Sequence, residues 1–526
     1  MNEFGVDNMF AEGGKAFTTF VNYVEGIYVG YKYYETAAVE AAAGNFEFDY
    51  DANVVYPFGY GLSYTTFTQE MSEINNDGTN ISFDVTVTNT GNVAGKDVVE
   101  VYFNPPYTNG GIEKAAANLV AFEKTETLEP GASATVSISF PVEDMASYDT
   151  YGNGCYVLES GDYEISINSD SHNKIAAKTV NIGSEVVYDQ NNKRSTDQVA
   201  ATNQFGFAEG GVTYLSRADG FKNYAEATAA PKSFELAEEY KKDYVNNTNY
   251  NEADYNNEAD AMPATGAKNG IKLEQLRGLE YDDPMWESLL DEMSVAEMNT
   301  LIELGGYETS AVESIGEVMT YDCDGPASIN NNFTHQGSIG FPAAVMIACT
   351  WNKDIAHRFG ASIGRMANDM DVSGWYAPAT NTHRSAFAGR NFEYYSEDGV
   401  LAGWMCANAV QGAREWGVYS YVKHFATNDQ ETNRTGLLCT WLNEQSLREI
   451  YLKSFEIAFK NGNPGATMVA FNNIGIEPAE ACSALLNTVL RGEWGFRGFA
   501  ETDYFGGYGY QDATIAMGIA RSEERF

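Results

Sequence analysis

The chain has 526 residues and carries 74 aspartates and glutamates against 32 lysines and arginines, which gives a formal charge of −42 at pH 7. This charge repels nucleic acid and anionic membrane surfaces, so neither is expected as a partner, whereas neutral sugars are unaffected by it. The length has room for roughly two to four domains.

The six cysteines show no CxxC motif and no paired spacing. Free buried thiols in a reducing compartment are therefore favoured over disulfides or a metal site, and we expect a cytoplasmic location. The first residues lack the basic and apolar regions of a signal peptide, and no apolar run is long enough to span a bilayer.

Residues 1–56 are too few to bury much core of their own. They are dense in aromatic residues over Tyr23–Tyr34. We interpret this region as the C-terminal end of a domain that begins before Met1.

Residues 57–185 show the alternation of apolar and polar residues that is typical of strands with one buried face. Turn signals at Thr90–Asn92, Glu129–Gly131 and Ser160–Asp162 separate the runs. Several short strands at this spacing predict an immunoglobulin-like or fibronectin type III-like β-sandwich. The clearest runs are Ile81–Gly91, Val98–Phe103, Ala134–Phe140 and Tyr163–Ile167.

Residues 186–269 lose this pattern. The stretch Asn246–Asn257 is rich in asparagine and acidic residues and poor in apolar ones. The region is therefore predicted to be an extended linker, interrupted by helical fragments around Phe234–Tyr244.

From residue 270 to 526, strand-like and helical runs alternate, which predicts a parallel barrel or a doubly wound sheet. We expect an incomplete barrel, because fewer strands are visible than the eight that close one. The strand-like runs end at Tyr321–Asp324, Met346–Cys349, Tyr376–Pro378, Tyr421–His424, Met468–Phe471 and Thr502–Asp503. The helical runs are Ala356–Met370, Leu401–Trp416 and Ser446–Lys460.

Charged side chains follow these strands, where a barrel presents its chemistry. Such a mixture suits a neutral sugar, because carboxylates accept hydrogen bonds from its hydroxyls while Arg, Lys and His donate. Neither metal-ligand spacing nor a glycine-rich phosphate motif accompanies them, so we expect no metal and no cofactor. The residues are Asp324, Arg390, Lys423, His424, Arg434 and Asp503.

Each of these residues also has a plain structural interpretation. Arg390 and Arg434 could form ordinary ion pairs with Glu393 and Glu431, and Asp324 could be a turn residue. The others could be solvated strand ends or helix caps. The joint occurrence of six such residues at strand ends favours one site over six coincidences.

Several motifs closely resemble glycoside hydrolase family three, and its β-glucosidases above all. In the barrel region they are Asp324–Ala327, Phe341–Ala344, Gly389–Asp398, Lys423–Arg434, Leu447–Leu452, Arg491–Phe496 and Thr502–Asp503. Pro57–Tyr64 and Asn89–Gly95 look like the family's fibronectin type III module, and Glu25–Tyr31 looks like the end of its α/β-sandwich domain. The barrel comes last here, as in circularly permuted members of the family.

By this resemblance, the chain is a retaining, exo-acting β-glucosidase that removes terminal nonreducing β-D-glucosyl residues from oligosaccharides, with Asp503 as nucleophile. Tyr504 stands where the family usually has tryptophan, and Phe471 where many members have tyrosine. The implied sugar-binding residues are Asp324, Arg390, Lys423, His424, Arg434, Met468 and Tyr504.

The family's acid/base is usually a glutamate on the α/β-sandwich domain, of which only the tail is recognisable here. Likewise, Ala520–Phe526 does not resemble the family's continuation. We therefore expect a polypeptide truncated at both ends and impaired as a hydrolase, in which Glu393, Glu397 and Glu431 brace the arginines. The alternatives are a β-xylosidase of the same family and a catalytically silent sugar-binding or interaction protein; homo-oligomerisation is left open.

Overall fold

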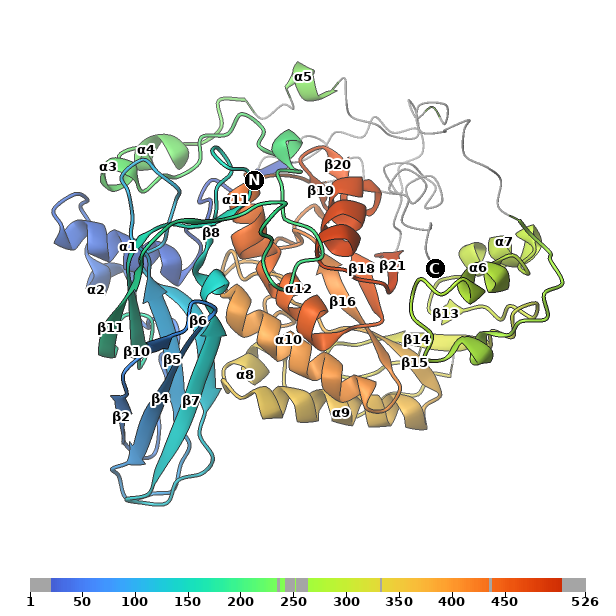
Figure 1. The fold of residues 1–526 in the computed structure, drawn as a ribbon, viewed down its shortest axis with the longest axis horizontal. Coiled ribbons are helices and arrows are strands. Elements are labelled where there is room, and N and C mark those ends of the chain that lie inside the picture. Colours follow the sequence, from blue (N-terminus) through green and yellow to red (C-terminus); the bar gives the residue numbers. More distant parts are fainter. Residues whose placement is uncertain are drawn as a thin grey trace.

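The computed structural model describes residues 20–233, 237–241, 251, 264–331, 334–434 and 438–503. Its chain begins with a segment that carries α1 (Tyr31–Ala42) and α2 (Tyr50–Asn53). In Figure 1 a β-sandwich in blue and teal follows this segment, and a half-barrel in yellow, orange and red lies beside the sandwich.

Two antiparallel sheets of the sandwich enclose a common apolar core. In β4 (Asn80–Asn89), Ile81, Phe83, Val85 and Val87 are each at most 5% exposed, because alternate side chains of a strand point to the same face. The predicted sandwich is confirmed. Its first sheet contains β2 (Phe67–Met71), β3 (Asn75–Asn76), β4 and β7 (Ser133–Pro141), and the second contains β5 (Val98–Asn104), β6 (Asn118–Lys124), β10 (Gly161–Asn168) and β11 (Lys174–Ile182).

The described part of the predicted linker does not extend into solvent. After a small sheet of β8 (Ser147–Tyr148), β9 (Tyr156–Leu158) and β12 (Val186–Tyr188), the chain packs along the protein through α3 (Ala218–Phe221) and α4 (Tyr224–Ala227). Phe205 and Phe221 are buried, and Arg194 donates to Glu456 of the half-barrel at 2.6 Å. Phe205 and Phe221 are isolated apolar residues outside any helical or strand period, so the sequence did not predict that this region packs against the protein. Of 246–257, only Asn251 lies within the described residues.

Five parallel strands and one short antiparallel strand form the sheet of the half-barrel. The predicted fold class, an incomplete parallel barrel preceded by a sandwich, is confirmed. The strand order is β13 (Glu308–Thr309), β14 (Thr320–Asp324), β15 (Val372–Tyr376), β16 (Tyr419–Phe425), β18 (Ala466–Val469) and β21 (Phe499–Thr502).

The strand predicted to end at Met346–Cys349 is wrong, because these residues belong to α8 (Ala344–Ala348). A short apolar run fits a buried helix as well as a strand. The three predicted helical runs are confirmed, and their helices cover one side of the sheet in Figure 1. They are α9 (Lys353–Asp369), α10 (Gly399–Arg414) and a continuous segment with α11 (Glu444–Ser446), π-type turns at Leu447–Tyr451 and Ala458–Gly462, and α12 (Lys453–Ile457).

A small helical unit precedes the parallel strands. A capping box fixes the start of its second helix, because the Ser294 hydroxyl bonds the Glu297 N–H while the Glu297 carboxylate accepts from the Ser294 N–H. Leu276, Leu289 and Val312 form its own apolar core. Its elements are a 3-10 turn at Leu273–Leu276, α6 (Met285–Leu290) and α7 (Val295–Glu303).

The N-terminal segment is joined to the half-barrel by a sheet of its own. Here β1 (Phe20–Asn22) runs parallel to β17 (Cys439–Trp441), which continues to β19 (Asn473–Ile474) and β20 (Glu477–Pro478). The remaining helical pieces are α5 (Glu238–Lys241), 3-10 turns at Val142–Met145, Gly206–Ala208 and Ala479–Ala481, and a π-type helix at Ala484–Glu493. Among the described helices, none is long and apolar enough to cross a membrane. All six cysteines are free; Cys349 is exposed, against the prediction of buried thiols, and the other five are buried.

Candidate active site

A buried lysine joins the ends of two strands. The Lys423 ammonium of β16 lies 2.9 Å from Asp324 Oδ1 at the end of β14, and only 3% of the lysine side chain is exposed. Burial alone would raise the pKa of Asp324, but the charge and hydrogen bond of Lys423 hold it below its usual value. The pair therefore keeps a charged donor and a charged acceptor side by side.

Glu393 extends this pair toward Arg390. Arg390 donates to both carboxylate oxygens of Glu393, at 2.6 and 2.7 Å, and Lys423 Nζ lies 3.8 Å from the same carboxylate. On its other side, Arg390 lies 3.9 Å from Glu431. A two-point contact of this kind fixes the plane of the guanidinium.

Asp503 follows β21 directly and is held on its open side by Arg434. The Arg434 guanidinium donates to Asp503 Oδ2 at 3.0 Å and to Glu431 at 2.8 Å, and it lies 4.9 Å over the ring of Phe471. The backbone N–H of Asp503 donates to the carbonyl oxygen of Val469 at 3.1 Å. The carboxylate is therefore fixed by backbone and side chain, and its side chain is 10% exposed.

His424 lies between Asp503 and Tyr394. Its Nε2 is 3.7 Å from Asp503 Oδ2, and its Nδ1 is 3.3 Å from the Tyr394 hydroxyl. Burial, helped by the nearby charges of Arg390, Lys423 and Arg434, holds the pKa of His424 well below its usual range. The imidazole is therefore neutral and can both donate and accept a hydrogen bond.

The structure thus brings together six of the eight residues predicted for the site. Met468 lies apart from their ion pairs, in an apolar cluster with Tyr376 and Tyr421 on the same sheet, and Tyr504 lies outside the described residues. The six are Asp324, Arg390, Lys423, His424, Arg434 and Asp503.

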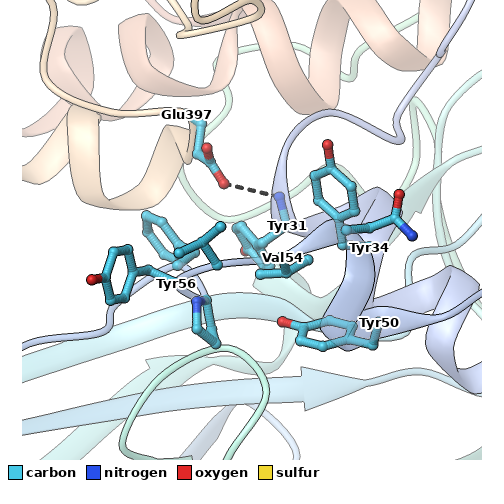
Figure 2. Close-up of a pocket in the computed structure, with 10 residues that line it drawn as sticks. Tyr31, Tyr34, Tyr50, Val54, Tyr56 and Glu397 are labelled. Atoms are coloured by element: carbon cyan, nitrogen blue, oxygen red, sulfur yellow. Dashed lines mark hydrogen bonds between the residues drawn. The ribbon is translucent and has the colours of Figure 1, made fainter.

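Two of the three expected braces hold arginines, and the third does not. Glu393 and Glu431 pair with Arg390 and Arg434, whereas Glu397 accepts a hydrogen bond from the backbone N–H of Tyr31 at 2.9 Å. Figure 2 shows Glu397 of the half-barrel pointing toward Tyr31 of the N-terminal segment. The pocket there has a volume of about 350 Å³, and four tyrosines are among its lining residues. The sequence motif could not reveal this, because the partner lies 366 residues away.

Tyr394, Asn428 and Asn381 were missed by the sequence reasoning, although all lie in or beside the quoted motifs. Asn428 donates to the Tyr394 hydroxyl at 3.3 Å and to Glu431 at 2.7 Å. Asn381 accepts from the His424 N–H at 2.8 Å and donates to the His424 carbonyl oxygen at 2.9 Å. These side chains are neutral, so they add no charged residue to the motifs, and only the fold shows that they contact the site.

Among the described residues, no three His, Cys, Asp or Glu side chains are grouped as metal ligands. The site is instead built from ion pairs and neutral hydrogen-bonding groups. Asp324 and Asp503 are its carboxylates at strand ends, with side chains 49% and 10% exposed.

Comparison with known proteins agrees with this chemistry. Residues 315–517 match the glycosyl hydrolase family 3 N-terminal domain, and residues 97–171 match a fibronectin type III-like domain. β-Glucosidase A of Butyrivibrio fibrisolvens is 31% identical over 96% of this chain and 62% of its own length. A β-glucosidase of Ruminococcus albus is 30% identical over 92% of this chain and 48% of its own.

A solved β-glucosidase structure from Paenibacillus barengoltzii superimposes with a TM-score of 0.72 and 27% identity, over 93% of this chain and 51% of that one. The fold is therefore that of a half-barrel with a fibronectin-like module, similar to these β-glucosidases. Residues 315–517 are thus assigned to glycoside hydrolase family three as its N-terminal domain, and residues 97–171 to the fibronectin type III-like domains. The chain spans about half to three fifths of the length of these relatives.

Proposed function

We propose that this polypeptide carries the sugar-binding residues and the nucleophile of a retaining, exo-acting β-glucosidase. The observation that supports this best is the placement of Asp503. Its carboxylate accepts from Arg434 at 3.0 Å, lies 3.7 Å from neutral His424, and shares one network with the Asp324–Lys423 pair. This is a charged acceptor on a rigid strand end, surrounded by groups that bind hydroxyls.

In the proposed reaction, Asp503 attacks the anomeric carbon of the nonreducing glucosyl residue. The bond to the leaving oxygen breaks as that oxygen takes a proton from an acid, and water then releases the sugar from the enzyme with retained configuration. Retention requires the second carboxyl group at roughly 5–5.5 Å from the first. We do not assign that role to Glu393 or Glu431, because each holds an arginine in place.

The other members of the network would hold the sugar ring. Asp324 accepts and Lys423 donates, which suits two adjacent hydroxyls, and the buried His424 contributes a neutral donor. Arg390 keeps its planar guanidinium fixed by Glu393. An ordered set of donors reduces the conformational entropy lost when the sugar binds.

The decisive experiment is the hydrolysis of an aryl β-glucoside by the purified chain, with detection of the anomer that is released first. We expect slow turnover, since no acid/base is assigned in this chain, with β-glucose released first and with loss of turnover in Asp503→Asn. Asp369→Asn, an exposed carboxylate at the end of α9, is the matched control and should leave the rate unaltered. Inverted product, or full turnover in Asp503→Asn, contradicts the mechanism.

Two other results would select the alternatives. Faster cleavage of an aryl β-xyloside than of the glucoside would identify a β-xylosidase. Saturable binding of glucose or cellobiose without any turnover would identify a sugar-binding protein. Binding should be lost in Asp324→Ala in every case, because that carboxylate is the partner of Lys423.

A further inference from the structure

The N-terminal segment contacts the stretch that runs from His424, near the end of β16, to Arg434. The Tyr23 hydroxyl donates to the Thr427 carbonyl oxygen at 3.3 Å and lies 3.5 Å from Asp429 Oδ2. Tyr23 is 0% exposed, and its ring packs 4.6 Å from that of Tyr451. None of these residues belongs to the ion pairs of the candidate active site.

The same segment also contacts the loop that follows β15, through Arg384. Glu25 forms an ion pair with Arg384, and Tyr451 donates to Glu25 at 3.1 Å. The Arg384 guanidinium lies 4.0 Å over the ring of Tyr23 and donates to the Asn22 carbonyl oxygen at 3.3 Å. The two loops therefore share one support.

Asp429 connects these two loops to each other. Its Oδ1 accepts from the Thr382 N–H at 2.7 Å, next to Asn381, which bonds His424 on both its N–H and its carbonyl oxygen. Asp429 is 2% exposed. A shift of Asp429 would thus move the backbone on which His424 is placed.

We propose that residues 20–25 are a positioning element of the sugar site, in which Tyr23 and Glu25 set the places of His424 and Arg434 through Asp429 and Arg384. The inference rests on the proposed function for its effect on sugar binding. Its geometric part, the ordering of residues 424–434, does not. Positioning of this kind matters because a binding group displaced by a fraction of an ångström loses its hydrogen bond.

The support responds to pH. Burial raises the pKa of Asp429 to about 7, against the opposing effects of the Thr382 N–H, the charge of Arg384 and the Tyr23 hydroxyl. Glu25 raises it as well, and Tyr394 and Tyr451 are the other titratable groups that face the carboxylate. Burial disfavours the ionised carboxylate in the ordered state, so the loops are better ordered below pH 7, where Asp429 is protonated, than above it.

The test compares Tyr23→Phe with Tyr28→Phe in the whole chain. Tyr28 is the matched control, because it lies in the same segment and is equally buried, while its hydroxyl donates at 2.5 Å to Glu113 on the other side. Cellobiose affinity is measured by calorimetry from about pH 5.5 to 8.5, and backbone hydrogen exchange is followed over residues 424–434.

We expect the affinity of the wild type to fall as pH rises through an inflection near pH 7. In Tyr23→Phe, exchange over 424–434 should be faster, the affinity roughly three- to tenfold weaker, and the inflection displaced upward, because a group that favours the charged carboxylate is removed. Asp429→Asn should abolish the inflection. Tyr28→Phe should alter neither the profile nor the exchange of this loop.

The inference is overturned if Tyr23→Phe and Tyr28→Phe change the exchange of residues 424–434 and the pH dependence of the affinity equally. This holds even if the wild type binds and hydrolyses glucosides. If the wild type does not bind cellobiose, the proposed function fails, and hydrogen exchange alone tests the positioning role of residues 20–25. Faster exchange of 424–434 in Tyr23→Phe then supports the positioning role, and unaltered exchange contradicts it.

Discussion

Gly360 on α9 lies so close to Ala409 on α10 that a Cβ atom added at residue 360 would be 1.9 Å from the Ala409 carbonyl oxygen. The contact is reciprocal, since a Cβ at Gly412 would lie 2.0 Å from the His357 carbonyl oxygen. Both obstacles are backbone atoms, which cannot turn aside like a flexible side chain. The two helices thus approach each other through glycine, and α10 also packs against β16 of the half-barrel sheet.

Gly360→Ala should therefore destabilise the protein, because the added methyl group forces α9 away from α10. We expect a loss of about 1–3 kcal/mol or more in the free energy of unfolding, measured by urea denaturation. Gly206→Ala is the control, since nothing lies within 4 Å of a Cβ at that position. A Gly360→Ala variant as stable as the control would show that the helices can separate without penalty.

The sequence predicted α9 and α10 as helices from their apolar period, but it could not predict this crossing. Glycine occurs in loops as well as at helix contacts. The glycines at positions 360 and 412 therefore do not reveal a helix crossing from the sequence alone. The sandwich was predicted for the opposite reason. Strict alternation over Ile81–Asn89 is difficult to produce in any other structure.

The site was predicted where charge follows a strand and missed where neutral groups complete it. Asp324 and Lys423 lie near the ends of β14 and β16, and Asp503 directly follows β21. The parallel order of these strands brings the three residues to the same edge of the sheet. Tyr394 and Asn428 depend on how loops fold back, and Glu397 on a partner from the N-terminal segment. Long-range partners of this kind leave no local pattern.

Arg448 forms hydrogen bonds to three segments of the chain. Its substitution should therefore strongly reduce the stability of the protein. Its guanidinium donates to Glu444 at 2.8 Å and to Glu493 at 2.8 and 3.1 Å, all buried, and to the part-buried Thr202 carbonyl oxygen at 2.7 Å. Arg448→Met leaves two buried carboxylates without a counter-charge, which costs about 3–5 kcal/mol of unfolding free energy. The midpoint of urea unfolding measures the loss.

The control for Arg448 is an exposed pair of the same type. Arg358 and Asp354 form an i,i+4 ion pair on α9, with side chains 69% and 61% exposed. Arg358→Met should change the unfolding free energy by less than about 1 kcal/mol, because water screens such a pair. Similar losses in the two variants would mean that the buried network around Arg448 contributes nothing beyond surface charge.

Lys423→Met should weaken glucose binding more than it weakens the fold. The substitution keeps the volume of the buried side chain but removes the charged donor that lies 2.9 Å from Asp324 and 3.8 Å from Glu393. A hydrogen bond to a charged group contributes about 1.5–3 kcal/mol, so the dissociation constant from calorimetry should rise roughly 10- to 150-fold. An unaltered constant would place the sugar away from this pair. Lys353→Met, at a partly exposed lysine on α9, is the control.

The stability of the protein should carry a pH dependence that comes from Asp429. Its folded-state pKa is about 7, above the value of roughly 3.9 for an unfolded aspartate. Between these values the folded state binds more protons than the unfolded state, so the contribution of Asp429 to the unfolding free energy falls as pH rises from about 4 to 7 and is constant above that range.

Asp429→Asn isolates this contribution, because the amide oxygen can still accept from the Thr382 N–H while no carboxylate is left to ionise. The stability of the variant relative to the wild type should therefore increase from pH 4 to pH 7 and then level off. Urea midpoints at several pH values measure this difference. A difference that is independent of pH would mean that Asp429 titrates normally, and that its burial between the two loops does not perturb it.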